Sequence, residues 1–182
     1  TIIPRPIAFV TSMAEDGTIN GAPFSYFNIV SSNPPMISLA LQRKEGKKRD
    51  TARNILKNQE FVVHIVDEMN VEAINITAAS LSPNQSEVEK ANLNLVSSES
   101  VSIPGIKEAK VRFECTLEHA VELGKNGDIG VDLVIGKIVR FHIDEEIYES
   151  GRINHGKLAA VSRLAGSNYA KIGETFSIER PK

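Results

Sequence analysis

The sequence predicts a mainly β fold, built as an antiparallel barrel or sandwich. Many short runs rich in β-branched and aromatic residues follow one another at close spacing, while helical patterns are few and short. The runs do not alternate regularly with helices, as they would in a parallel α/β sheet. A chain of 182 residues has the size of one domain, so we expect residues 1–182 to fold as a single unit.

Three β-rich runs mark the first third of the chain. Residues 5–14 predict a strand, and the Asp16-Gly17 pair directly after it is a strong signal for a hairpin turn. Residues 35–42 predict a second strand, which begins after the breaking pair Pro34-Pro35. Residues 60–66, which read EFVVHIV, predict a third.

Three short helical segments are also predicted. Residues 49–58 have the pattern of a helix, and Asp50 is placed to cap the unpaired N–H groups of its first turn. Residues 70–80 predict a second helix. The stretch from Ser86 to Glu89 has the spacing of a capping box and predicts one more helical turn.

Further strands are predicted in the second half of the chain. Residues 110–119 alternate between apolar and polar side chains, which is typical of a strand with one buried face. The apolar face of this strand consists of Val111, Phe113, Cys115 and Leu117. Residues 131–143 predict a long strand with a kink at Gly136. Residues 174–181 predict the last strand.

The composition argues against several classes of partner. A formal net charge of −2 gives no reason to expect nucleic acid or a membrane surface. No apolar run reaches the roughly 20 residues that a membrane helix needs. A single cysteine excludes an intrachain disulfide and a multi-cysteine metal site. The start of the chain lacks the basic and apolar regions of a signal peptide, so we expect a cytoplasmic protein.

The titratable residues do not indicate an acid–base or metal centre. The four histidines lack the spacing of metal ligands, and we expect His64 and His142 to be hydrogen-bonded structural residues inside strands. Cys115 lies in the apolar phase of its strand, which predicts an inert buried thiol. The pair Glu145-Glu146 indicates an exposed turn. We therefore predict no metal site, and the sequence identifies no catalytic residue.

Residues 21–35, GAPFSYFNIVSSNPP, are unusual because they alternate aromatic rings with hydrogen-bonding side chains. The stretch is too polar for a buried strand and too apolar for an ordinary surface loop. Its apolar members are Phe24, Tyr26, Phe27, Ile29 and Val30, and its polar members are Ser25, Asn28, Ser31 and Ser32. Such a wall suits a ligand with polar edges and flat apolar faces. Ordinary barrel core is the alternative that the residues leave open.

A second informative stretch is the basic segment at residues 42–54. Five cationic residues, Arg43, Lys44, Lys47, Lys48 and Arg49, come just before the predicted start of a helix. A helix N-terminus presents free N–H groups and the positive end of the helix dipole, so this segment is a candidate phosphate site. Arg49 and Thr51 would add a charge and a hydroxyl. The alternative is a solvated charged loop.

Near the C-terminus, residues 162–173 form a loop with small residues at its centre and one aromatic side chain, Tyr169. Loops of this composition often close over a pocket. An ordinary turn explains the same residues equally well.

Six blocks of the chain, taken in order, resemble the flavin reductase-like, FMN-binding split-barrel family, and in particular its longer branch with a PRPIA opening. The blocks are PRPIAFVTS, NGAPFSYFNIVSSNPP, RDTARNI, EFVVHIV, GRINHGKL and RLAGSNYAKIGETF. The resemblance extends from Pro4 to Pro181 and is loose between residues 70 and 101. Two positions depart from the family pattern. Arg49 stands where Lys is more common, and Ala165 stands where a second Gly is common.

The resemblance implies a six-stranded antiparallel Greek-key split β-barrel with a few peripheral helices, and a homodimer with FMN at its interface. It also accounts for residues 21–35, since FMN is a flat tricycle with polar edges. Phe24 or Phe27, together with Tyr26, would wall the ring, and Arg49 with Thr51 would hold the phosphate. The cofactor-binding positions that it implies are Thr11, Ser12, Ser25, Tyr26, Phe27, Asn28, Ser31, Ser32, Arg49 and Thr51.

The resemblance implies the activity of an NAD(P)H-dependent flavin reductase. Such an enzyme would pass electrons to free flavin, or supply reduced flavin or electrons to a partner oxygenase. Hydride transfer between two rings needs no protein acid or base, which agrees with the lack of a catalytic candidate. Tyr169 would order the nicotinamide. Two alternatives remain, namely an FMN electron carrier without a nicotinamide site and a non-enzymatic split-barrel binding module.

Overall fold

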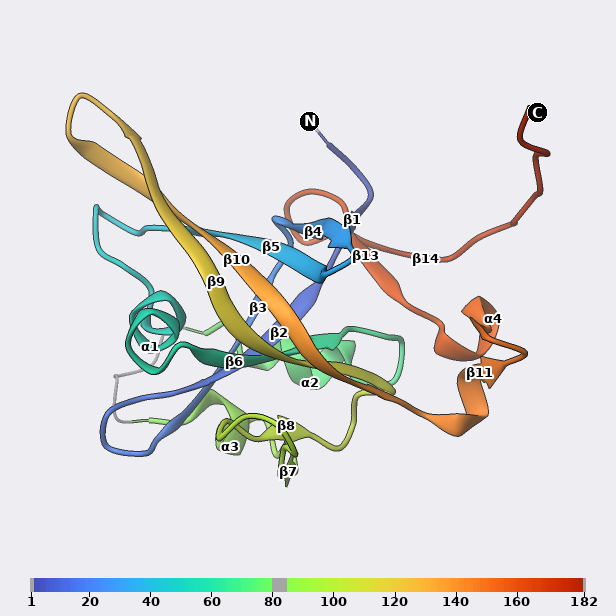
Figure 1. Cartoon of the computed structure of the whole chain (residues 1–182), viewed down its shortest axis with the longest axis horizontal. Helices are drawn as coiled ribbons and strands as arrows, with labels where there is room; N and C mark the ends of the chain where they lie inside the picture. Colours follow the sequence, from blue (N-terminus) through green and yellow to red (C-terminus); the bar gives the residue numbers. More distant parts are fainter. Residues whose placement is uncertain (1, 80–84, 182) are drawn as a thin grey trace.

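The computed structural model describes residues 2–79 and 85–181 and is mainly β, as predicted (Figure 1). Its main sheet has seven antiparallel strands in the order β3-β2-β6-β9-β10-β5-β4. The strands are β2 (Ala8–Met13), β3 (Ile19–Phe24), β4 (Phe27–Ser32), β5 (Pro35–Gln42), β6 (Glu60–Ile65), β9 (Val111–Lys125) and β10 (Asp128–Ile143). The expected count of six was therefore wrong. The additional strand is β4, which belongs to the ladder because Phe27 pairs with Leu39 of β5.

The two edges of this sheet are joined by only two residues. β3 lies at one edge and β4 at the other, yet β3 ends at Phe24 and β4 begins at Phe27. Because consecutive Cα atoms lie about 3.8 Å apart, the two edges approach within about 11 Å here. The N–H of Ala40 donates to the carbonyl of Tyr26 at 2.9 Å and ties the joint to β5. The sheet thus curls into a barrel that remains open along this line, which we call the seam (residues 23–28).

The opposite part of the barrel is the long hairpin of β9 and β10, which rises away from the rest of the molecule (Figure 1). Asn126 and Gly127 form its turn, with φ angles of 54° and 83°, the left-handed backbone that a tight hairpin requires. The predicted kink at Gly136 is confirmed as a shift of register in the ladder. A Cβ at Gly136 would lie 2.4 Å from the Phe61 ring, so only glycine fits there.

The core has two main parts, which lie on the two faces of β2. Ala8 and Val10 point into the barrel, while Phe9 between them points outward. The barrel core is Ala8, Val10, Ile37, Leu39, Leu41, Ala52, Ile55, Phe61, Val63, Cys115, Val134 and Ile138. The second core lies between the outer face of β2 and the helices α2 and α3 and includes Phe9, Val66, Ile74, Val88 and Ile106. β2 is therefore covered on both faces.

Among the described residues, four short α-helices surround the barrel. They are α1 (Asp50–Asn58), α2 (Val71–Ile76), α3 (Glu87–Lys90) and α4 (His155–Leu158). The helical turn predicted at residues 86–89 is confirmed as α3, and the Ser86 hydroxyl accepts from the N–H of Glu89 as its N-cap. The capping role expected of Asp50 was wrong. Arg49 is the N-cap of α1 without a side-chain hydrogen bond, and Asp50 already lies in the first turn. The last residue of the predicted helix 70–80 lies outside the described residues.

A smaller sheet of order β1-β13-β14 lies beside the seam and consists of β1 (Arg5–Pro6), β13 (Val161–Arg163) and β14 (Tyr169–Lys171). The predicted strand 5–14 is thus two strands, β1 and β2. The remaining short elements are β7 (Leu95–Val96), β8 (Gly105–Ile106), η1 (Glu145–Ile147), β11 (Tyr148–Glu149) and β12 (Arg152–Ile153). The strand expected at residues 174–181 is absent, because the segment runs away from the body and pairs with no described strand (Figure 1).

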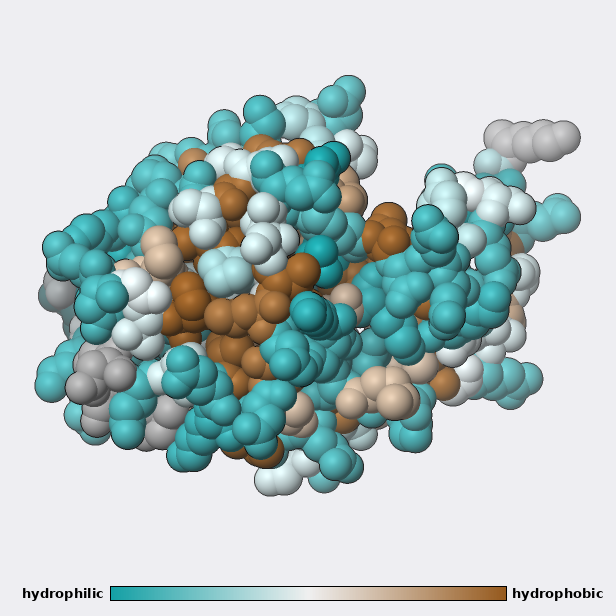
Figure 2. Space-filling view, turned by 90° about the horizontal axis from the view of Figure 1, so that it is seen from below, coloured by the Kyte–Doolittle hydropathy of each residue, from teal (hydrophilic) through white to brown (hydrophobic). Residues whose placement is uncertain are grey.

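The lower face of the molecule shows how the apolar groups are distributed over one side of the surface. Seen from below Figure 1, apolar side chains gather near the middle of the body and hydrophilic side chains surround them (Figure 2). A notch separates this body from the lobe that carries β11 and α4. Within residues 2–79 and 85–181, the helices are all too short or too polar to cross a membrane.

Candidate functional site

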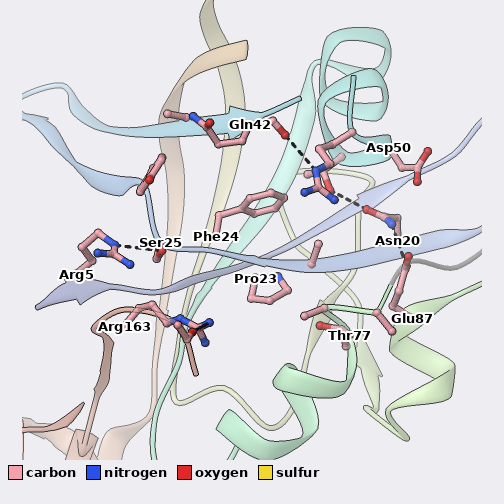
Figure 3. A pocket seen from close by; sticks show the side chains of 18 residues that line it. Arg5, Asn20, Pro23, Phe24, Ser25, Gln42, Asp50, Thr77, Glu87 and Arg163 are labelled. Carbon is pink, nitrogen blue, oxygen red and sulfur yellow. Dashed lines mark hydrogen bonds between the residues drawn. The ribbon is translucent and has the colours of Figure 1, made fainter. Parts of the chain in front are cut away.

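A cavity of about 490 Å³ opens at the seam of the barrel. Its walls come from β3, the joint at Ser25 and Tyr26, the end of β5, the first turn of α1, and the segments that follow α2 and β13 (Figure 3). Three arginines line it, Arg5, Arg49 and Arg163, against two carboxylates, Asp50 and Glu87. The cavity therefore has a net positive lining and the aromatic rings of the seam in its wall.

The first turn of α1 supplies one end of the cavity. The exposed guanidinium of Arg49 donates from Nε to the carbonyl of Gln42 at 3.1 Å, which fixes the side chain beside the helix start (Figure 3). Because no side chain caps this helix, its first N–H groups are available to an anion. Thr51 lies in the same turn and is buried. The arrangement is that of a phosphate site at a helix N-terminus.

Two other cations of the basic segment, Arg43 and Lys48, bind carboxylates of the β9–β10 hairpin. Arg43 binds Asp132 bidentately at 2.7 and 3.0 Å, and both Arg43 and Lys48 bind Glu122. The hydrogen bond from Lys48 lowers the pKa of Glu122, and Arg43 lowers it further. The hydrogen bond to Asp132 raises the pKa of Arg43. These two cations hold the loop against the β9–β10 hairpin and do not line the cavity.

A buried polar network forms the floor of the cavity. The Thr51 hydroxyl donates to Oδ1 of Asn20 at 2.9 Å, and Nδ2 of Asn20 donates to Glu87 at 2.8 Å (Figure 3). Ser12 joins the same network, since its hydroxyl lies 3.4 Å from Oδ1 of Asn20. Asn54 donates to Ser12 at 3.2 Å. Asn20 is therefore the residue that positions Thr51, and neither Asn20 nor Glu87 was among the predicted site residues.

The other end of the cavity carries the remaining two arginines. Nε of Arg5 donates to the Ser25 hydroxyl at 3.3 Å, and its guanidinium lies 5.7 Å from the centre of the Tyr26 ring. The guanidinium of Arg163 lies 4.5 Å from the centre of the Tyr169 ring. Figure 3 shows Arg5 and Arg163 on the side of the cavity away from Asp50.

The cavity continues beyond Arg163 as two further hollows. The first, of about 220 Å³, shares Pro23, Phe24 and Arg163 with the cavity and is also lined by Asn75 and Tyr169. The second, of about 450 Å³, shares Asn75 and Tyr169 with the first and follows α2. The predicted loop residue Tyr169 therefore lies where these two hollows meet.

The structure brings together only part of the predicted site. Ser25, Tyr26, Arg49 and Thr51 line the cavity, and Ser12 supports it from below. Thr11 is buried elsewhere and donates to the carbonyl of Pro104 at 2.7 Å. The other four, Phe27, Asn28, Ser31 and Ser32, line a separate apolar groove of about 430 Å³ over β4, β5 and β10.

The buried titratable residues in strands are structural, as expected. His64 donates from Nδ1 to the carbonyl of Phe9 and accepts at Nε2 from the N–H of Ile106, both at 3.0 Å. Burial lowers the pKa of His64 to about 3. Nε2 of His142 lies 2.6 Å from the buried carboxylate of Glu114. Burial also raises the pKa of the Cys115 thiol, which is therefore inert.

The residues around the cavity fit FMN in size and in donor chemistry. A volume of about 490 Å³ lies within the usual range of roughly 300–1,000 Å³ for pockets that bind small molecules. An uncapped helix start with an arginine beside it suits a phosphate, and the hydroxyls and amides of the floor suit a polyol chain. The rings of Phe24 and Tyr26 in the wall suit a flat apolar face.

Comparison with solved structures identifies close relatives of this fold. Nitrilotriacetate monooxygenase component B from Bacillus cereus is 56% identical, with a TM-score of 0.96 over 98% of this chain and 89% of that chain. The 2-nitrobenzoate 2-nitroreductase NbaA from Pseudomonas fluorescens is 30% identical, with a TM-score of 0.88 over 100% and 87%. A split-barrel protein from Shewanella frigidimarina NCIMB 400 shares the fold at 20% identity, with a TM-score of 0.87 over 97% and 86%.

The sequence comparisons agree with the structural ones. The protein YwrF of Bacillus subtilis (strain 168) is 52% identical over 184 residues, which cover 100% of this chain and 90% of YwrF. The family profile described as "Flavin reductase like domain" matches residues 1–160. The topology, the seam and these matches agree, and the chain belongs to the flavin reductase-like domain family.

Proposed function

We propose that this protein is an FMN-binding flavin oxidoreductase that uses NADH or NADPH. It would pass electrons to free flavin, or supply reduced flavin or electrons to a partner oxygenase. The observation that carries the proposal is the cavity at the seam, with Arg49 and the uncapped start of α1 at one end and aromatic rings in its wall. The high identity to a monooxygenase component supports the oxygenase as acceptor. We further propose that the protein works in the cytoplasm.

The chain's own part in this activity is to bind and orient. Arg49 and the first turn of α1 hold the phosphate, while Asn20 keeps Thr51 in place beneath it. When bound, FMN would accept a hydride at N5 from the nicotinamide C4, and this chemistry is the cofactor's own. The residues of the cavity bring the two rings into contact.

We also propose a homodimer with the cofactor near its interface. The apolar groove over β4 and β5 exposes large side chains, with Ile29 69% exposed and Phe141 49% exposed. Contiguous exposed apolar surface of this kind marks an interaction site. Asn28, Ser31 and Ser32 line this groove, so a second copy seated there gives them access to a cofactor shared by two subunits. Dilution to the monomer should then release flavin, and Ile29→Arg should have the same effect.

A visible absorption spectrum tests the activity directly. We expect purified protein to bind FMN and the bound flavin to lose its visible absorption when NADH or NADPH is added without oxygen. Bound flavin that neither nicotinamide bleaches would indicate an electron carrier that takes electrons from a protein donor. Protein that gains no flavin spectrum with added FMN would indicate a binding module without a flavin.

A further inference from the structure

Arg5 and Arg163 face each other directly across the ladder between β1 and β13, and both line the seam cavity. Like charges placed directly opposite each other destabilise an antiparallel pair. Arg5 bonds the carbonyl of Ile2 at 2.7 Å and the Ser25 hydroxyl, and Arg163 bonds the carbonyl of Gly166. Among the described residues, neither guanidinium has a carboxylate within 4.0 Å.

Each of these guanidiniums lies over a tyrosine ring, Arg5 at 5.7 Å from the centre of Tyr26 and Arg163 at 4.5 Å from the centre of Tyr169. Cation–π contacts of this kind favour one placement of the guanidinium and leave N–H donors for an anion. The pair is therefore two positioned cations without an ion-pair partner among the described residues. The repulsion between them is offset when an anion binds both.

The place of the pair in the cavity separates it from the phosphate site at α1. Figure 3 shows Arg5 and Arg163 on the side away from Asp50, which lies in the first turn of α1. Beyond Arg163 the cavity continues through the hollow at Tyr169 into the one along α2. The cavity is thus extended by two hollows beyond Arg163, and the pair lies at the start of this extension.

We infer that Arg5 and Arg163 clamp the diphosphate of a dinucleotide co-substrate, whose remote nucleoside lies in the hollows along Tyr169 and α2. Guanidinium groups bind phosphate oxygens bidentately, and two adjacent guanidiniums match two adjacent phosphates. Val71, Val161 and Tyr169 offer the remote nucleoside an apolar wall. The inference rests on the proposed function, in which the co-substrate is a nicotinamide dinucleotide.

The test uses FMN-loaded protein and two probes. ADP-ribose carries the diphosphate but no nicotinamide, and 1-benzyl-1,4-dihydronicotinamide carries the reducing ring but no phosphate. We expect the double variant Arg5→Gln with Arg163→Gln to weaken ADP-ribose binding and raise the KM for NADH by at least about tenfold. Reduction by the benzyl compound and the affinity for FMN should stay unchanged. Arg152→Gln, at an exposed arginine outside these hollows, is the matched control.

Three results would overturn the clamp. They are a wild-type protein that does not bind ADP-ribose, a double variant that binds it as tightly as wild type, and a double variant that loses FMN. The last would assign the pair to the flavin phosphate. If neither reductant bleaches the wild-type flavin while ADP-ribose binding still depends on the pair, the proposed function fails and the clamp stands. If the double variant does not fold, Arg5→Lys and Arg163→Lys replace it. Lysine keeps the positive charge but cannot make the bidentate hydrogen bonds of a guanidinium, so these variants should bind ADP-ribose with intermediate affinity.

Discussion

The polar side chains of the barrel wall and those of the seam differ in how completely the chain itself satisfies them. In the barrel wall and the loop that packs against it, Arg43 has two carboxylate partners, and both ring nitrogens of His64 have backbone partners. Around the seam cavity, the acceptors that Arg5, Arg49 and Arg163 find among the described residues are carbonyls and one hydroxyl. All of these residues are cations or potential cations, so charge alone does not separate the two groups.

This difference separates residues that stabilise the fold from residues that are available to a ligand. A buried charge with a complete set of partners strongly destabilises the protein when one partner is removed. A cation with free donors at a cavity contributes little to the fold and much to a bound anion. Substitutions in the wall should therefore change stability and leave ligand binding intact, whereas substitutions around the seam cavity should weaken the binding of an anionic group and change stability little.

The largest effect is expected for Arg43→Gln. The change leaves Asp132, which is 3% exposed, without its bidentate partner. We expect the Tm of the flavin-free protein to fall by about 10 °C, measured by calorimetry. FMN affinity among folded molecules should not change. Lys44→Gln, at the exposed neighbouring residue, serves as the control. An equal fall in Tm for both variants would show that the lost ion pair with Asp132 is not the cause.

The pH dependence of stability provides a second test of the wall. His64 is neutral in the folded protein, because burial lowers its pKa from 6.5 to about 3. Its contribution is complete above pH 6.5 and is lost as the pH falls toward 3, since the unfolded chain then binds a proton that the folded chain excludes. Between pH 7 and pH 5 we expect wild type to lose about 2 kcal/mol of unfolding free energy relative to His64→Gln.

The exposed His119 offers the control for this experiment. His119→Gln should follow the wild-type curve in urea unfolding across the same pH range. If His64→Gln also follows that curve, the neutral buried state of His64 is not the cause of the pH dependence.

At the seam, Arg49→Ala should weaken FMN by about 1.5 kcal/mol, which is about tenfold in the dissociation constant. Riboflavin lacks the phosphate, so its affinity should change little. Flavin fluorescence titration measures both ligands. Lys57→Ala, in the last turn of the same helix, is the control. Equal losses for FMN and riboflavin would show that the first turn of α1 does not hold the phosphate.

The smallest effect is expected for Asn28→Leu in the groove over β4. Asn28 is exposed, and within the described part of the chain its Oδ1 accepts from the N–H of Ile29 alone, so the Tm of the flavin-free protein should stay nearly constant. If a second subunit binds at this groove and brings it near the cofactor, the binding free energy of FMN should weaken by about 1 kcal/mol. A clear fall of the apo Tm with unchanged FMN affinity would instead make Asn28 a structural amide.

Local patterns were enough to predict much of the fold. The hairpin at Asp16-Gly17, the strand at residues 60–66 and the helical turn at residues 86–89 depend on neighbours in sequence, and all three are present. β4 was missed because its strand character comes from pairing with β5 and from closure of the barrel. The strand expected at residues 174–181 does not form. Its sequence is typical of a strand, but the segment pairs with no described strand.

The site could be predicted only in part, since its pairings are distant in sequence. Arg49 was found from a helix signal beside it. The carboxylate partners of Arg43 lie 79 and 89 residues away in sequence. The sequence therefore showed the charge of Arg43 but not the carboxylates that pair with it. Asn20 and Glu87, 67 residues apart, meet only when β3 packs against α3. No local signal marks either residue as part of a binding site.

The joint of two residues between β3 and β4 also determines how the barrel opens. Neighbouring strands of the main sheet are held together by ladders of backbone hydrogen bonds, whereas its first and last strands, β3 and β4, are joined through the two residues between them. Fluctuations that separate these edges break few bonds, and amides there exchange with solvent more readily than those of the long hairpin. A ligand in the cavity contacts β3, the two-residue joint and the end of β5. We therefore expect its binding to hold these segments together and to slow hydrogen exchange in β3 and at the joint.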